Sequence, residues 1–120
     1  MLEQEIKRTL MRFGIRSNLK GFWYIVDAVR YIVENDDFRN LKVMSVYSAV
    51  GETYEENWKR VERCIRHAIE RMYIMCEIDA IAAVLGERTN LWTGKLTNKE
   101  FLWTLADHFA DVGKMLEAGA

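Results

Sequence analysis

The 120-residue sequence contains no proline, only two cysteines and no long apolar run. A helix that crosses a bilayer needs about 20 mainly apolar residues, and the N-terminus, MLEQEIKR, lacks the apolar stretch of a signal peptide. Cys64 and Cys76 are too few for a disulfide framework, and their spacing matches no zinc ligand pair. We therefore expect a cytoplasmic protein with free thiols and with no membrane contact, metal or other cofactor.

The sequence also lacks an excess of charge of one sign. It has 17 basic and 18 acidic residues, a net charge of −1 and a pI near 6.1. Many DNA-binding domains are basic, so a DNA-binding surface here must come from the arrangement of charge. Catalytic groups are few as well. Cys64 and His67 stand three residues apart, but a helical wheel places Cys64 at the edge of the buried side and His67 outside it, and we expect no enzyme.

Apolar residues make up half of the sequence, which is enough for one packed domain over residues 1–120. Their period is helical, and the missing proline agrees with helices joined by short turns. The pattern predicts an all-α domain of six helices. We expect them over residues 2–13, 19–35, 41–54, 58–73, 78–85 and 97–116, the fourth with a possible extension to residue 75.

Residues typical of helix ends separate these segments. Gly14 suits a left-handed stop after the first helix, and Asn57 suits the cap of the fourth. Thr97 and Glu100 form a capping-box pattern at the start of the last helix. Residues 86–95 are expected to form a loop. In the third helix, one face is expected to consist of Leu41, Met44, Tyr47 and Val50.

The helix over residues 58–73 carries most of the functional argument. A wheel at about 100° per residue gathers Val61, Ile65, Ala68, Ile69 and Met72 into one apolar stripe. The opposite side receives Lys59, Arg60, Glu62, Arg63, Arg66, His67 and Glu70. A helix, a three-residue turn and a helix with a basic N-terminal half are typical of a helix-turn-helix. A solvated face of an ordinary helical bundle gives the same periodicity, and the pattern alone leaves both interpretations open.

The chemistry of the outward side chains fits base and phosphate contacts. An arginine guanidinium can bind O6 and N7 of one guanine. Glu62 can accept from cytosine N4, or it can pair with Arg66 four residues later. His67 can donate to a phosphate oxygen.

A helical protein-interaction module is the rival hypothesis. Exposed aromatic anchors would favour it, although we expect most of the four tryptophans, Trp23, Trp58, Trp92 and Trp103, in the core. Ile74 and Met75 are likewise expected in the core rather than on a partner surface.

The segment RVERCIRHAIE, residues 60–70, closely resembles the recognition helix of the C-terminal DNA-binding domain of the sporulation stage 0 protein A response regulator family. Four flanking segments follow the order of that family. They are NLKGFWYIVDAV at 18–29, VYSAVGETY at 46–54, IDAIAAVLG at 78–86 and KLTNKEF at 95–101. The resemblance covers about residues 5–112.

The resemblance implies a six-helix domain that binds double-stranded DNA at an element like TGTCGAA, often in tandem or dimeric copies, and regulates transcription. By position it implies base contacts from Arg60, Glu62 and Arg63. The residues expected near phosphates or flanking bases are Asn57, Lys59, Arg66, His67 and Lys95.

The family also contacts the sigma subunit of RNA polymerase near the start of the fifth helix, where Glu77 and Asp79 are the candidates here. The turn departs from the family because Glu55 and Glu56 replace uncharged residues, and two acids beside a phosphate backbone should weaken binding. A receiver domain does not fit in this length. We expect either an excised domain or a stand-alone paralogue.

Overall fold

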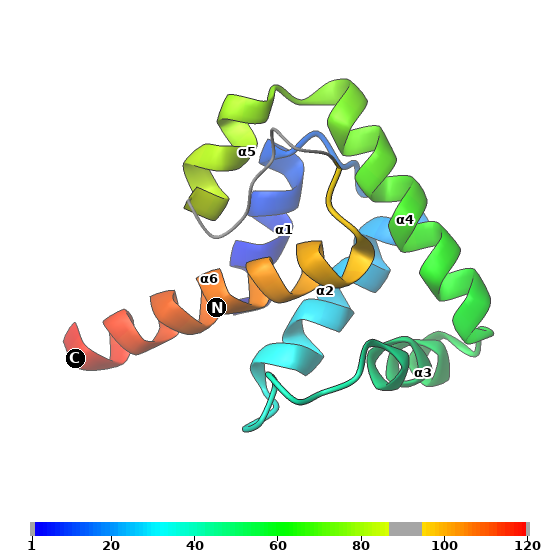
Figure 1. Ribbon diagram of the computed structural model, residues 1–120, viewed down its shortest axis with the longest axis horizontal. Coiled ribbons are helices and arrows are strands. Elements are labelled where there is room, and N and C mark those ends of the chain that lie inside the picture. The colour runs from blue at the N-terminus through cyan, green and yellow to red at the C-terminus, as the bar shows by residue number, and fades with distance from the viewer. Residues whose placement is uncertain (1, 87–94, 120) are drawn as a thin grey trace.

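The computed structural model describes residues 2–86 and 95–119, with side chains up to Asp111. This part of the chain forms six α-helices and no strand, which confirms the predicted all-α class. They are α1 (Leu2–Arg12), α2 (Lys20–Val33), α3 (Val43–Tyr54), α4 (Trp58–Met75), α5 (Ile78–Leu85) and α6 (Asn98–Gly119). In Figure 1, α4 runs along one side of the molecule, and α3 lies across the N-terminal end of α4. The C-terminal end of α6 stands clear of the other helices.

Helix α2 is the centre of the core. It contacts α1, α3, α4 and α6, and most of its residues are apolar, as expected for a helix that is covered on nearly every side. Burial of each large apolar side chain contributes about 1.5–3 kcal/mol. The buried residues of α2 are Gly21, Phe22, Tyr24, Ile25, Val26, Ala28, Val29 and Ile32.

The helix ends lie within three residues of the prediction, and the predicted end signals are confirmed. Gly14 has a φ of 78°, in the left-handed region that glycine adopts without strain. In the capping box, the Glu100 N–H donates to Thr97 Oγ1 at 3.1 Å and the Thr97 N–H donates to Glu100 Oε1 at 3.0 Å. Trp92 and most of the expected loop lie outside the described residues.

Three residues expected to be packed inside are exposed instead. Met44 is 42 % exposed because α3 turns Val46 inward, with Tyr47 and Val50, and Met44 lies off that face. Ile74 and Met75 are 73 % and 50 % exposed. The buried stripe of α4 ends at Met72, and Ile74 and Met75 lie in the last turn, beyond the part of the helix that the core covers. Local apolarity was therefore the wrong criterion at the end of α4.

The expectation of mostly buried tryptophans is also wrong for the three that the structure describes. Trp23 and Trp58 are exposed, and Trp103 is half-buried. Trp23 donates its indole N–H to the Ser17 carbonyl oxygen at 2.7 Å, and Trp103 donates to the carbonyl oxygen of Phe38 at 2.8 Å. An indole with a polar N–H is well suited to this border between core and solvent.

Candidate nucleic-acid interface

Helices α3 and α4 form a helix-turn-helix with the predicted turn of three residues, 55–57. The chain reverses at Glu55, which has a left-handed φ of 54°. The Glu56 N–H then donates to the Gly51 carbonyl oxygen at 2.8 Å. A Cβ at Gly51 would stand 2.5 Å from the Glu56 carbonyl oxygen. Glycine is therefore required where the turn passes over α3.

The predicted cap of α4 is present. Asn57 has an extended backbone, and its Oδ1 accepts from the Lys59 N–H at 2.8 Å. This bond satisfies one of the amide groups that a helix start leaves without a partner. The cap thus fixes where α4 begins and leaves the side-chain amide nitrogen of Asn57 as a further donor.

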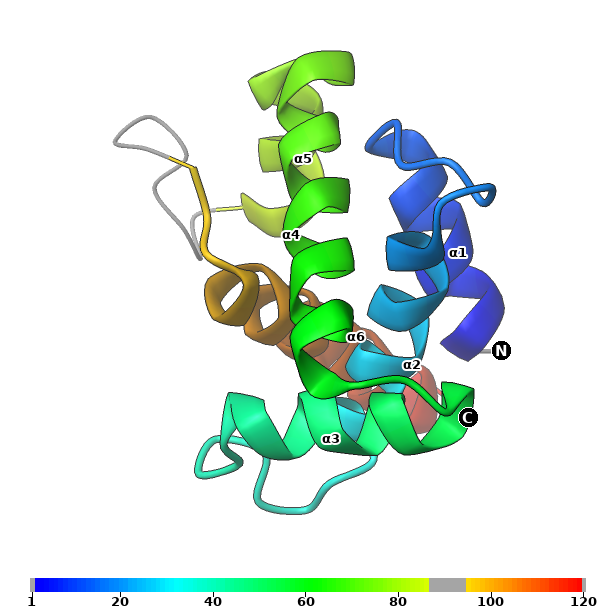
Figure 2. The same cartoon turned by 90° about the vertical axis from the view of Figure 1, so that its right-hand side faces the viewer.

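The apolar stripe of α4 anchors the helix as predicted. Its five residues, Val61, Ile65, Ala68, Ile69 and Met72, are all buried. On the other side Lys59, Arg60, Arg63, Arg66, His67 and Glu70 are exposed, and Glu62 is half-buried. Figure 2 shows α4 in front of the molecule, with the start of α2 to one side and the start of α6 to the other. The basic half of α4 is therefore exposed on the side away from the core.

Two of the three central arginines are held in ion pairs on the surface. Arg60 Nε lies 3.4 Å from Glu56 Oε1, and Arg66 Nε lies 3.2 Å from Glu62 Oε1. Among the described residues, Arg63 takes part in no ion pair. Exposed pairs of this spacing are worth about 0.3–0.5 kcal/mol, so DNA can displace them. Glu62 thus makes the pair with Arg66 that the sequence left open.

One edge of α4, made of Glu62, Arg66, Ile69 and Glu70, faces the start of α6; we call it the α6 edge. A groove of about 470 Å³ separates this edge from residues 95–99. Lys95 and Lys99 line the groove, so the predicted phosphate contact Lys95 is on the same side of the molecule as Arg66. The Leu96 N–H donates to Tyr73 Oη at 2.9 Å, which ties this segment to α4.

Asn98 is a structural link at this edge that the sequence did not reveal. Its Nδ2 donates to the Glu62 carbonyl oxygen at 3.0 Å and to Tyr47 Oη at 3.1 Å. One side chain therefore joins α3, α4 and α6. Burial raises the pKa of Tyr47, which keeps its hydroxyl neutral in this position. The capping box predicted the start of α6, but no pattern marked Asn98.

The other edge of α4 faces α2 and consists of Arg60, Cys64, His67 and Arg71; we call it the α2 edge. Here the two helices approach at Gly21. A Cβ on this residue would stand 2.3 Å from the Cys64 carbonyl oxygen and 2.8 Å from Ala68 Cβ. The first turn of α2 therefore lies directly against the middle of α4.

The family comparison agrees with this geometry. The family described as Sporulation initiation factor Spo0A C terminal matches residues 6–109 of the chain. The chain belongs to this family. Spo0A C-terminal domains are DNA-binding effector domains of transcription regulators, and DNA binding and transcription regulation are therefore the function of this domain.

The described part of the chain contains no group of three or more side chains placed to hold a metal ion. In the same residues, no helix is both long and apolar enough for a membrane span. The cysteines Cys64 and Cys76 are both free and half-buried. Burial raises the pKa of the Cys76 thiol, whose Sγ donates to the carbonyl oxygen of Arg12 at 3.6 Å.

The two residues expected at the sigma subunit, Glu77 and Asp79, are exposed at the start of α5. They follow the last turn of α4, at the opposite end of that helix from Asn57. The fold thus separates them from the basic first half of α4. Beside them, Ile74 and Met75 add exposed apolar surface.

Proposed function

We propose that this domain binds an element like TGTCGAA with the first half of α4 in the major groove. The observation that carries the proposal is the division of α4 into a fully anchored apolar stripe and an exposed basic face. The major groove admits an α-helix, and every base pair presents a distinct set of donors and acceptors there. A helix held on one side by the core can therefore read bases with the other.

The proposal gives each polar residue a role. Arg60 and Arg63 bind guanine O6 and N7, and Glu62 accepts from cytosine N4. Phosphates or flanking bases are contacted by Asn57, Lys59, Arg66, His67 and Lys95. Support comes from the exposure of these side chains, since only Glu62 is half-buried. Arg60 and Arg66 would exchange their carboxylate partners for DNA.

An affinity comparison of two variants tests these roles. The wild type, Arg63→Ala and Lys95→Ala are titrated into a TGTCGAA duplex and into a scrambled duplex. Arg63→Ala should cost about 1–3 kcal/mol on the matched duplex and reduce the preference between the two. Lys95→Ala should weaken both complexes by the same factor. Equal losses on both duplexes for Arg63→Ala would refute its role in base reading. A wild type that binds neither duplex would favour a protein-interaction module.

Contact with the RNA polymerase sigma subunit, and binding of several copies to tandem elements, complete the proposal. The exposure of Glu77 and Asp79 beside Ile74 supports a protein contact at the start of α5. Glu77→Lys should then lower transcription from a target promoter while DNA affinity stays unchanged. Loss of DNA affinity in this variant would argue against a separate protein contact.

A further inference from the structure

The α2 edge of α4 carries one positive charge, that of Arg71, which the roles above do not use. Arg60, Cys64, His67 and Arg71 follow one another at helical spacing, so they line one side of α4. Cys64 is half-buried beneath Gly21, and the three nitrogen-bearing side chains are exposed. Arg71 has no role in base reading because it lies eleven positions beyond Arg60.

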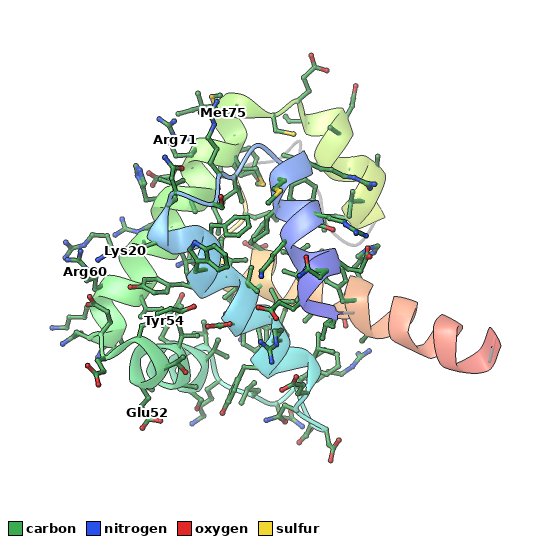
Figure 3. The ribbon with its side chains drawn as sticks, turned by 180° about the vertical axis from the view of Figure 1, so that it is seen from behind. Lys20, Glu52, Tyr54, Arg60, Arg71 and Met75 are labelled. Carbon is green, nitrogen blue, oxygen red and sulfur yellow. The ribbon has the colours of Figure 1, made fainter. Side chains whose placement is uncertain are left out.

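Lys20 brings a further cation to this edge from another helix. It is the first residue of α2, and its neighbour Gly21 lies against Cys64 and Ala68. One turn later, Tyr24 lies close enough to α4 that its pKa, raised mainly by burial, responds to Glu56, Cys64 and Arg60. Helices α2 and α4 therefore run in opposite directions here. In Figure 3, Lys20 lies between the levels of Arg71 and Arg60 along the α2 edge.

The turn before α2 extends this positive surface. Arg16 is exposed and lines a groove of about 460 Å³ together with Met75, at the end of α4. The part of the chain that the structure describes gives no ion pair to Arg16, Lys20, His67 or Arg71.

Acidic side chains are scarce on this side. The two acids of α4, Glu62 and Glu70, line the groove on the α6 edge. The first turn of α2 has no acidic residue. Two acids do lie near it: Glu56 is paired with Arg60, and Asp27 lies beside Tyr54, farther along α2. The surface around Lys20 and Arg71 thus attracts anions even though the whole chain has a net charge of −1.

We propose that Lys20 and Arg71 bind backbone phosphates of the DNA strand opposite the one near Lys95. This inference rests on the proposed placement of α4 in the major groove. A major groove is bounded by two phosphate backbones about 12 Å apart, so a helix within it has one strand on each side. Lys95 and Arg66 face one strand from the α6 edge, and Lys20 and Arg71 face the other from the α2 edge.

Phosphate contacts have a signature that separates them from base contacts. The slope of log affinity against log salt is negative. Each lost phosphate contact makes it less negative by about 0.9, because fewer counterions are released. At 0.1 M salt this slope corresponds to a loss of roughly eightfold per contact. The loss should be the same on matched and scrambled duplexes, since phosphates carry no sequence information.

The test uses Lys20→Gln, Arg71→Gln and the double variant, titrated on both duplexes at several salt concentrations. Arg39→Gln is the matched control, because Arg39 is an exposed cation on the connection between α2 and α3. We expect each single variant to lose roughly eightfold on both duplexes and the control to keep the wild-type affinity. Lys20→Arg, which retains the charge, should also bind as the wild type does. Unchanged circular dichroism confirms that the variants are folded.

The inference is overturned if the double variant keeps the wild-type affinity and salt slope. If Arg63→Ala still reduces the preference for the matched duplex, the proposed function stays intact. The ligand of this surface would then be an acidic protein instead of DNA. A loss confined to the matched duplex would also overturn it, since it would show base reading. If the wild type binds no DNA, the proposed function itself fails.

Discussion

The two edges of α4 are fixed to the rest of the domain by different means. On the α2 edge, backbone meets backbone at Gly21, with no room for a side chain. On the α6 edge, a groove separates the helices, and Asn98 bridges them with hydrogen bonds. Charge differs as well, because the α6 edge contains Glu62 and Glu70 whereas the α2 edge contains no acid. One recognition helix thus has a closely packed, basic edge and a looser edge of mixed charge.

This contrast indicates how the reading helix keeps its position. Steric contact resists movement of α4 toward α2, because overlap of backbone atoms costs energy steeply. Hydrogen bonds from Asn98 set the distance on the other side. The first kind of restraint should be the more sensitive to a single added methyl group, and the second to the loss of one donor.

The largest effect is expected from Gly21→Ala, which breaks the packed edge. The new Cβ would stand 2.3 Å from the Cys64 carbonyl oxygen, which cannot rotate away. Overpacking of this kind should lower the free energy of unfolding by about 3 kcal/mol, measured by urea denaturation. In an unconstrained helix the same substitution stabilises by roughly 0.5–1 kcal/mol. The sign of the change in the free energy of unfolding therefore shows whether the two helices are in contact. A stabilised variant would show that α2 and α4 do not touch.

Asn98→Ala should have an intermediate effect, because it breaks the looser edge. It removes the donor to the Glu62 carbonyl oxygen and to Tyr47 Oη. We expect a loss of about 1–2 kcal/mol in the free energy of unfolding. Asn40→Ala is the control, since Asn40 donates to the carboxylate of Asp37 in an exposed loop. Equal effects of the two substitutions would mean that Asn98 does not hold α4.

Glu56→Gln should change the free energy of unfolding least. It removes a negative charge beside Arg60 and so makes the α2 edge more positive relative to the α6 edge. It removes the only ion-pair partner that Arg60 has among the described residues. Affinity for the matched duplex should rise roughly twofold, as expected from the strength of a surface pair of this spacing. Glu52→Gln is the control, because it removes the same charge from an exposed site on α3. If both variants gain equally, only total charge matters.

The local features of the recognition helix were predictable from the sequence. The stripe from Val61 to Met72 has a clear helical period, and Asn57 and Thr97 are residues that cap helices by their own chemistry. Such signals depend only on neighbours in the chain. They can therefore be recognised without knowledge of the tertiary structure.

Features that depend on the packing of distant segments were not predictable in the same way. The contact of Gly21 with Cys64 joins residues 43 positions apart, and Asn98 meets Tyr47 across 51. The apolar composition of Ile74 and Met75 predicts burial, but the packing of the other helices leaves both exposed. The charge of the α2 edge was also missed, because Lys20 joins it only through the antiparallel packing of α2 on α4.

The close passage of the turn over Gly51 has a consequence for recognition. Main-chain contacts hold the turn between α3 and α4 closely against Gly51. The free domain therefore already holds the shape that a duplex would meet. The conformational entropy of arranging these two helices is lost when the protein folds, and docking need not reduce it again.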